Sequence, residues 1–308
     1  MAKHVKLVAL LMVVLLATFA LAQSVRPGSQ HDDLRPNGKH GSDDNGVAAG
    51  AARVGGATVT GSGINYHGGP VILGTTDVYF IWYGTWNATA KNILTTYAQF
   101  TGGSPYFNIN TTYWSGTSTA KNFVSNSVHY VTSTTDNYSL GKSLSDANIQ
   151  TIVANHINNG NLPSDTNAVY FVLTASDVNE TSGFCTQYCG WHTHGTINGR
   201  DIKYAFVGNA ARCLNACAAQ TTSPNGDAGG DASASIVAHE LEEAVSDPDL
   251  NAWFDNTGEE NADKCAWTFG TVSRASNGSA YNMTLGGLHM LIQRNWLNSG
   301  AGSCVLSH

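Results

Sequence analysis

Basic residues are scarce in this sequence of 308 residues. It has 15 Lys and Arg against 22 Asp and Glu, which gives a formal net charge of −7 at neutral pH. An acidic chain with scattered positive charges lacks the basic patch that binds nucleic acid or an anionic membrane surface. The composition therefore predicts that nucleic acid is not a partner.

Long apolar runs are also rare, and the one that stands out lies at the start of the chain. Residues 1–22 combine a basic start (Lys3, Lys6), an apolar run over residues 7–21 and a small-residue ending, which are the three parts of a secretory signal peptide. The run is short for a membrane anchor, and no later stretch approaches a span. We expect a secreted protein with no membrane span in the mature chain.

Several catalytic motifs are missing. There is no Gly-x-Ser-x-Gly elbow for a serine nucleophile, no glycine-rich phosphate loop and no internal repeat. Cysteine is present, and in an exported chain disulfides are its expected state. Six cysteines allow fifteen pairings, among which the sequence alone does not choose. The disulfide candidates are Cys185, Cys189, Cys213, Cys217, Cys265 and Cys304.

The chain divides into a polar N-terminal part and one folded domain. Residues 23–56 are rich in Gly and Asp and lack apolar periodicity, which predicts a disordered linker or propeptide. Residues 57–308 have the length and apolar content of a single domain.

Strand and helix patterns alternate within the domain. Apolar and β-branched runs predict strands at residues 71–73, 78–84, 127–132, 168–174 and 202–208. Helical spacing and capping residues predict helices at 87–100, 145–158 and 231–245, the last ended by Pro248. Together these elements predict an α/β (α+β) domain with a mixed central sheet, flanking helices and disulfide-stapled loops. The pair His239-Glu240 on the last helix makes the expected domain zincin-like.

The last of these helices carries the most specific chemical signal, the stretch AHELEEAVSDP at residues 238–248. His239 and Glu243 are four residues apart, so a helix presents both on one face to a single metal ion. Glu240 is placed to act as general base on a metal-bound water. The pattern is that of the zinc-hydrolase helix H-E-x-x-H with Glu in place of the second His.

A third zinc ligand is expected from the acidic segment after the helix. Glu260 and Asp263 are the candidates, with Glu259 as a nearby alternative and Asp247 at the helix end as a weaker one. Zinc would polarise the scissile carbonyl while Glu240 transfers the proton to the leaving group. The competing interpretation is an acidic surface helix whose glutamates are solvated.

A second cluster, GFCTQYCGWHTHG at residues 183–195, contains two cysteines and two histidines. A structural zinc site is one interpretation, but thiols in an exported chain more often form disulfides. His192 and His194 could line the active cleft, as an extra ligand or an oxyanion-stabilising group. The alternative is an ordinary pair of loop histidines.

Three separated motifs carry a family resemblance: YHGGPVI followed by VYFIWYG, then GFCTQYCGWHTHG, then YAFVGNAARCLNAC. From about Tyr66 to Cys304 the chain resembles the EXORDIUM family, also called phosphate-induced protein 1 and known mainly from plants. The positions of the six cysteines fit that family. The resemblance implies a secreted protein of the cell wall or apoplast, linked to growth and cell expansion and without a settled biochemical activity.

Two functions therefore follow from the sequence. The first is a secreted zinc-dependent hydrolase, most simply a peptidase, with an extracellular peptide as substrate. The second is a non-catalytic extracellular protein that binds a cell-wall or surface component.

Overall fold

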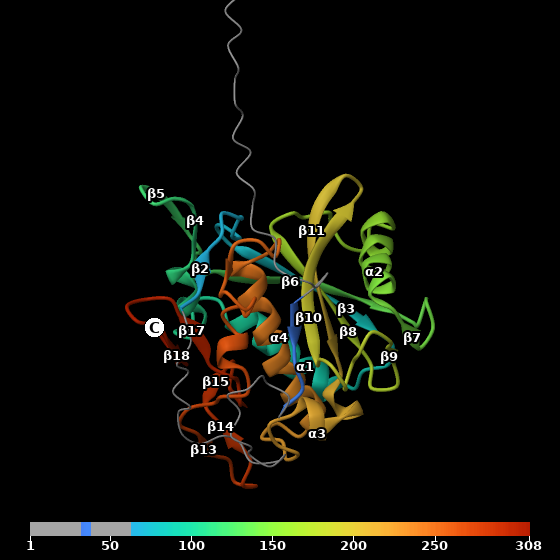
Figure 1. Ribbon diagram of the computed structural model, residues 1–308. Coiled ribbons are helices and arrows are strands. Elements are labelled where there is room, and N and C mark those ends of the chain that lie inside the picture. The colour runs from blue at the N-terminus through green and yellow to red at the C-terminus, as the bar shows by residue number, and fades with distance from the viewer. Residues whose placement is uncertain (1–31, 38–62) are drawn as a thin grey trace, which may run out of the picture.

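The computed structural model describes residues 32–37 and 63–308, and its centre is a six-stranded sheet (Figure 1). The strand order is β1-β10-β11-β8-β3-β6. The sheet is mixed, because β6, β3, β8 and β11 run parallel, whereas β10 runs antiparallel to β11 and β1 antiparallel to β10. The strands are β1 (Asp32–Leu34), β3 (Thr76–Tyr83), β6 (Val128–Asp136), β8 (Ala168–Thr174), β10 (Gly190–Ile197) and β11 (Arg200–Gly208).

Helices lie on both faces of this sheet. On one face α1 (Ala88–Phe100) and α4 (Ala228–Ser246) contact each other, and α4 also contacts β10 and β11. On the other face α2 (Asp146–Asn158) packs against β8 and β11 (Figure 1). The short helix α3 (Leu214–Cys217) lies beside α4. The described chain is therefore a three-layer α/β structure.

Local sequence explains these elements. All seven residues of β8 are buried, as expected for an apolar strand covered on both faces. Asn87 caps α1 by accepting a hydrogen bond from the Ala90 N–H, and Ser145 forms a capping box with Asn148 at the start of α2. Pro248 disfavours helical geometry at Asp247, so α4 ends at Ser246.

Short hairpins and turns complete the chain around the sheet. The small paired strands are β2 (Asn65–Tyr66) with β12 (Trp253–Phe254), β4 (Trp114–Thr117) with β5 (Ala120–Phe123), β7 (Ser143–Leu144) with β9 (Asn179–Glu180), β13 (Ser273–Arg274) with β14 (Ala280–Tyr281), β15 (Met283–Leu285) with β16 (Leu288–Met290), and β17 (Asn295–Leu297) with β18 (Ser303–Val305). The 3₁₀ turns are η1 (Phe107–Thr112), η2 (Ala210–Arg212) and η3 (Asp263–Cys265).

All six cysteines form disulfides. The pairs are Cys185–Cys213, Cys189–Cys217 and Cys265–Cys304. This confirms the predicted disulfides. Because Cys185 and Cys189 are each bonded to another cysteine, neither thiol is free to bind a structural zinc ion. Three disulfides fit an extracellular protein. Among the described helices, none has the length and apolar content needed to span a bilayer.

The structure confirms the mixed sheet, the flanking helices and the stapled loops. The predicted strand at residues 71–73 is wrong, because the chain there is irregular and the Ile72 N–H donates to the carbonyl of Val245. The His, Thr and Gly residues of residues 190–197 predict a loop, but the structure has strand β10 there. The predicted signal peptide at residues 1–22 lies outside the described residues. Residues 32–37 fall inside the predicted linker and include β1.

Candidate metal centre

The middle of α4 is buried on every side. His239, Glu240, Glu242 and Glu243 are all 0% exposed because α4 is covered by the sheet, by α1 and by the segments that follow it. His239 and Glu243 share one face of the helix, with Nε2 of His239 2.9 Å from Oε1 of Glu243. The four-residue spacing therefore places two potential ligands together, as the sequence predicts.

The segment after α4 returns to this face through η3. Oδ1 of Asp263 lies 3.4 Å from Nε2 of His239, and the backbone N–H of Asp263 donates a 3.0 Å hydrogen bond to Oε1 of Glu243. The Cys265–Cys304 disulfide holds the end of η3 against β18. His239, Glu243 and Asp263 thus form one group of converging ligand atoms.

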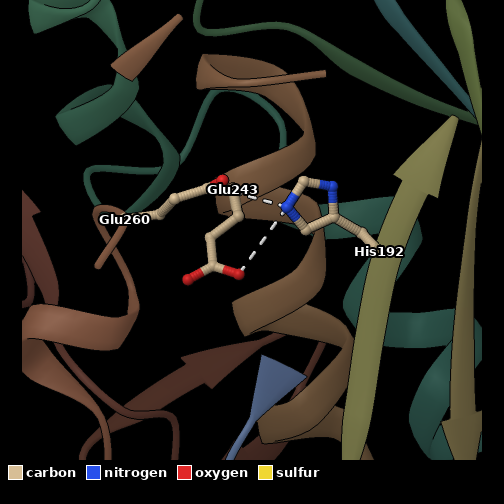
Figure 2. Close-up of side chains that lie close together, drawn as sticks. All are labelled: His192, Glu243 and Glu260. Carbon is tan, nitrogen blue, oxygen red and sulfur yellow. Dashed lines mark hydrogen bonds and ion pairs between the residues drawn. The ribbon is translucent and has the colours of Figure 1, made fainter. Parts of the chain in front are cut away.

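A second group meets on the other oxygen of Glu243. His192 projects from β10, with Nε2 3.1 Å from Oε2 of Glu260 and 3.9 Å from Oε2 of Glu243 (Figure 2). All three side chains are at most 1% exposed. Glu260 and His192, both candidates from the sequence, therefore lie at the site, but they form a group distinct from the one around His239.

Glu240 points toward the start of β10. A Cβ added at Gly190 would lie 2.7 Å from Oε1 of Glu240 and 2.6 Å from Cγ2 of Ile236, closer than real Cβ contacts allow. The glycine therefore leaves the space that the Glu240 carboxylate uses. Because Gly190 and His192 lie on one face of β10, Glu240 and the metal-ligand candidates share the space between β10 and α4.

The electrostatics of the site favour a positive charge. Burial lowers the pKa of His239, but the carboxylates of Glu243 and Asp263 outweigh it and raise that pKa well above its usual range. The side-chain amide of Gln293 contacts Nδ1 of His239 and orients the ring with Nε2 toward the carboxylates. Gln293 is far from α4 in sequence, so no local pattern revealed this role.

Other candidates from the sequence lie elsewhere. Nδ1 of His194 is 2.7 Å from Oδ1 of Asp201, and the ammonium of Lys203 lies 2.7 Å from Asp201 and 3.4 Å from Asp249. This cluster already contains a cation, the Lys203 ammonium, and its group of His194, Asp201 and Asp249 is separate from the two groups above, so a role of His194 in the cleft stays a prediction. Glu259 pairs with Arg35, and Asp247 accepts two backbone hydrogen bonds at the helix end.

A neighbouring side of α4, about 100° around the helix from Glu243, holds a different carboxylate, Glu242. The amides of Asn110 and Asn295 both donate to its Oε2, and the Asn261 amide donates to its backbone carbonyl. Burial raises the pKa of Glu242 to about 8, more than these hydrogen bonds lower it. The side chain is therefore mostly a neutral acid at pH 7. The asparagines come from distant segments, so no local sequence pattern indicates this network.

Comparison with known proteins finds a matching family and similar proteins from plants. The model of the phosphate-induced protein 1 conserved region matches residues 64–286. Protein EXORDIUM-like 3 of Arabidopsis thaliana is 31% identical over 76% of this chain and 80% of its own length. EXORDIUM-like 5 of the same plant is 30% identical over 76% and 75%, and PHOSPHATE-INDUCED 1 of Nicotiana tabacum is 29% identical over 50% and 51%. No solved structure gives a significant match.

Proposed function

The chain belongs to the phosphate-induced protein 1 (EXORDIUM) family, and because the names of its relatives state no chemical activity, we propose its function from the site: a secreted zinc-dependent hydrolase of the peptidase type. The observation that supports this proposal most directly is that ligand atoms of His239, Glu243 and Asp263 lie close together in the interior of the protein. Glu260 and His192 adjoin this group through the second oxygen of Glu243.

The donor set fits zinc. Imidazole nitrogen and carboxylate oxygen are zinc ligands with bonds of about 2.0–2.2 Å, so two donors on one tetrahedral ion lie roughly 3.3 Å apart. The separations of 2.9 Å and 3.4 Å from Nε2 of His239 to Glu243 and Asp263 bracket this value. Burying several carboxylates beside two histidines is costly unless a cation compensates them, which also supports a metal ion.

The division of roles follows from position. Zinc supplies a Lewis acid that polarises a carbonyl and lowers the pKa of water. Glu240 is the general base that accepts the proton of the attacking water and delivers it to the leaving amine. Gln293 fixes the ring of His239, and the N–H of Asp263 fixes the carboxylate of Glu243.

Zinc content of the purified full-length protein tests this function. We expect at least about one zinc ion per chain after loading and desalting, and about one ion fewer in His239→Ala than in the wild type. His194→Ala is the matched control, because His194 belongs to the Lys203 ion-pair network. A folded wild-type chain that retains no zinc would contradict the proposal and favour the non-catalytic binding protein.

A further inference from the structure

The carboxylate of Glu243 stands between two histidines and offers one oxygen to each. Oε1 is 2.9 Å from Nε2 of His239, and Oε2 is 3.9 Å from Nε2 of His192. Each histidine has its own additional carboxylate, Asp263 for His239 and Glu260 for His192. The two groups are thus similar in composition and share Glu243. Figure 2 shows the group that contains His192.

The charge of the cluster also exceeds what one divalent ion neutralises. The carboxylates of Glu243, Glu260 and Asp263 meet at the site with two imidazoles that are neutral when they bind metal. Glu240, buried on the same stretch of α4, adds a fourth carboxylate that acts electrostatically on His239. One divalent cation leaves two negative charges in a buried space. A second cation balances them, which removes the cost of burying unpaired charge.

From these two observations we propose that the centre is dinuclear and that Glu243 bridges the ions. The second ion is held by His192, Glu260 and Oε2 of Glu243, and the first by His239, Asp263 and Oε1. This inference rests on the proposed zinc site and extends it. Paired metal ions that share ligands are common in hydrolases, where they stabilise both the attacking and the leaving atoms.

Metal stoichiometry separates the second site from the first. In zinc-loaded full-length protein we expect about two zinc ions per chain by elemental mass spectrometry, about one in both His192→Asn and Glu260→Gln, and less than one in Glu243→Gln. The control His194→Asn keeps about two. One zinc in the wild type, unchanged in folded His192→Asn and Glu260→Gln, overturns the second site and leaves the proposed function standing.

A spectroscopic measurement on the wild type avoids any concern about folding of the variants. Protein loaded with manganese is expected to give an exchange-coupled paramagnetic resonance spectrum, because a carboxylate bridge couples two adjacent ions. A spectrum of isolated manganese at full loading overturns the bridge.

A separate observation concerns residues 32–37, which lie against the edge of the sheet beside this centre. Strand β1 pairs antiparallel with β10, with Asp32 opposite His192 and Leu34 opposite Gly190. The carbonyl of Leu34 accepts from the Cys189 N–H at 2.7 Å, and the N–H of Asn37 donates to the Ala216 carbonyl at 2.7 Å. The segment is therefore held largely through its backbone.

Side chains of the segment add specific contacts. Leu34 is 1% exposed, and it lies opposite the glycine that borders Glu240. Arg35 pairs with Glu259 at 3.1 Å, and its carbonyl accepts from Nε1 of Trp267 at 2.8 Å. Backbone pairing along an edge strand, with one buried aliphatic side chain, is how proteins bind extended peptides by β-strand addition.

We infer that the β10 edge is a binding site for an extended peptide with an aliphatic residue followed by arginine, and that residues 32–37 occupy it in cis. The pairing register places a bound peptide alongside both Gly190 and His192. The site stands on strand geometry alone, so its test is independent of zinc.

Peptide exchange tests this site. A full-length version with a specific-protease recognition sequence inserted at residues 45–50 is cut, so that residues 32–37 are held without a covalent link to the domain. Excess free peptide DDLRPN is expected to displace the N-terminal fragment on gel filtration. The peptide carrying Asp at the Leu34 position is expected to fail.

A variant gives a second readout. Leu34→Asp is expected to bind labelled DDLRPN at least about tenfold more tightly than the wild type, measured by fluorescence anisotropy, because its own segment no longer competes. Leu73→Asp, at a residue that is 40% exposed, is the control. A fragment that peptide cannot displace, or a folded Leu34→Asp that binds no better than wild type, overturns the inference.

Discussion

Glu242 and Glu243 follow each other on α4 and are both fully buried, but they point about 100° apart around the helix and have different partners. Glu242 meets the amides of Asn110 and Asn295, which neither carry charge nor bind a metal strongly. Glu243 meets two histidines and the N–H of Asp263. A buried carboxylate is thus accommodated in two ways on one helix, as a neutral acid among amides and as a candidate ligand among imidazoles.

The largest expected effect is loss of bound metal when Glu243 is changed and Glu242 is kept. Glu243→Gln is expected to weaken zinc binding at least about a hundredfold, because it removes a charged ligand shared by both groups. Glu242→Gln, the same substitution one residue earlier, is expected to keep the zinc content of the wild type. Equilibrium dialysis of the two variants measures this, and equal zinc content in both would abolish the distinction between the faces.

The next effect concerns the base rather than the ligands. Glu240→Gln is expected to retain zinc and lower the rate of peptide hydrolysis about 10²–10⁴-fold, since an amide cannot accept the proton. Cleavage of a mixed peptide library followed by mass spectrometry gives the rate, with Glu242→Gln as the control. Full activity in Glu240→Gln would remove the assigned mechanism while leaving the metal site intact.

The burial of Glu242 among side-chain amides predicts that the stability of the folded chain depends on pH. The pKa of Glu242 rises from 4.5 to about 8 on folding, so between these values the folded chain holds a proton that the unfolded chain has lost. Its contribution to the free energy of unfolding is present below pH 4.5 and is lost as pH rises through 8, at up to about 1.4 kcal/mol per pH unit.

Denaturant unfolding between pH 5 and pH 8 checks this prediction. Wild type is expected to lose more stability over this range than Glu242→Gln, which has no proton to release. Parallel profiles for the two proteins would show that Glu242 is ionised in the folded state, and would remove the contrast with Glu243.

The sequence predicts the surroundings of Glu243 as a group of candidate metal ligands, but it does not predict the amide network around Glu242. His239, Glu240 and Glu243 follow from helical periodicity, and Glu260 and Asp263 follow from their place just after the helix. The network of Glu242 joins η1, α4 and β17, and the ring of His239 is fixed by Gln293, all through contacts between distant segments. Such contacts depend on the fold and leave no local pattern.

Strand β10 is a second case in which contacts between distant segments decide the structure and the local sequence does not reveal it. Its sequence GWHTHGTI alternates poorly and predicts a loop, but pairing with β11 and β1 imposes the extended conformation. His192 was therefore recognised as a residue of interest without its position. The pairing turns His192 toward Glu243 and Glu260, whereas His194, two residues on, pairs with Asp201 and Asp249.

The smallest predicted effect tests whether Glu240, on α4, needs the close approach of this helix to β10. Gly190→Ala would place a methyl group 2.7 Å from Oε1 of Glu240 and 2.6 Å from Cγ2 of Ile236. We expect the substitution to lower the free energy of unfolding by about 1–3 kcal/mol through overpacking. We also expect it to lower the rate of hydrolysis below that of the wild type, because it displaces Glu240. Gly63→Ala is the matched control, because a Cβ there meets nothing within 4 Å. If Gly190→Ala matches Gly63→Ala in both unfolding free energy and rate, Glu240 does not depend on the space beside β10, and its placement as the base must be sought on another side of the helix.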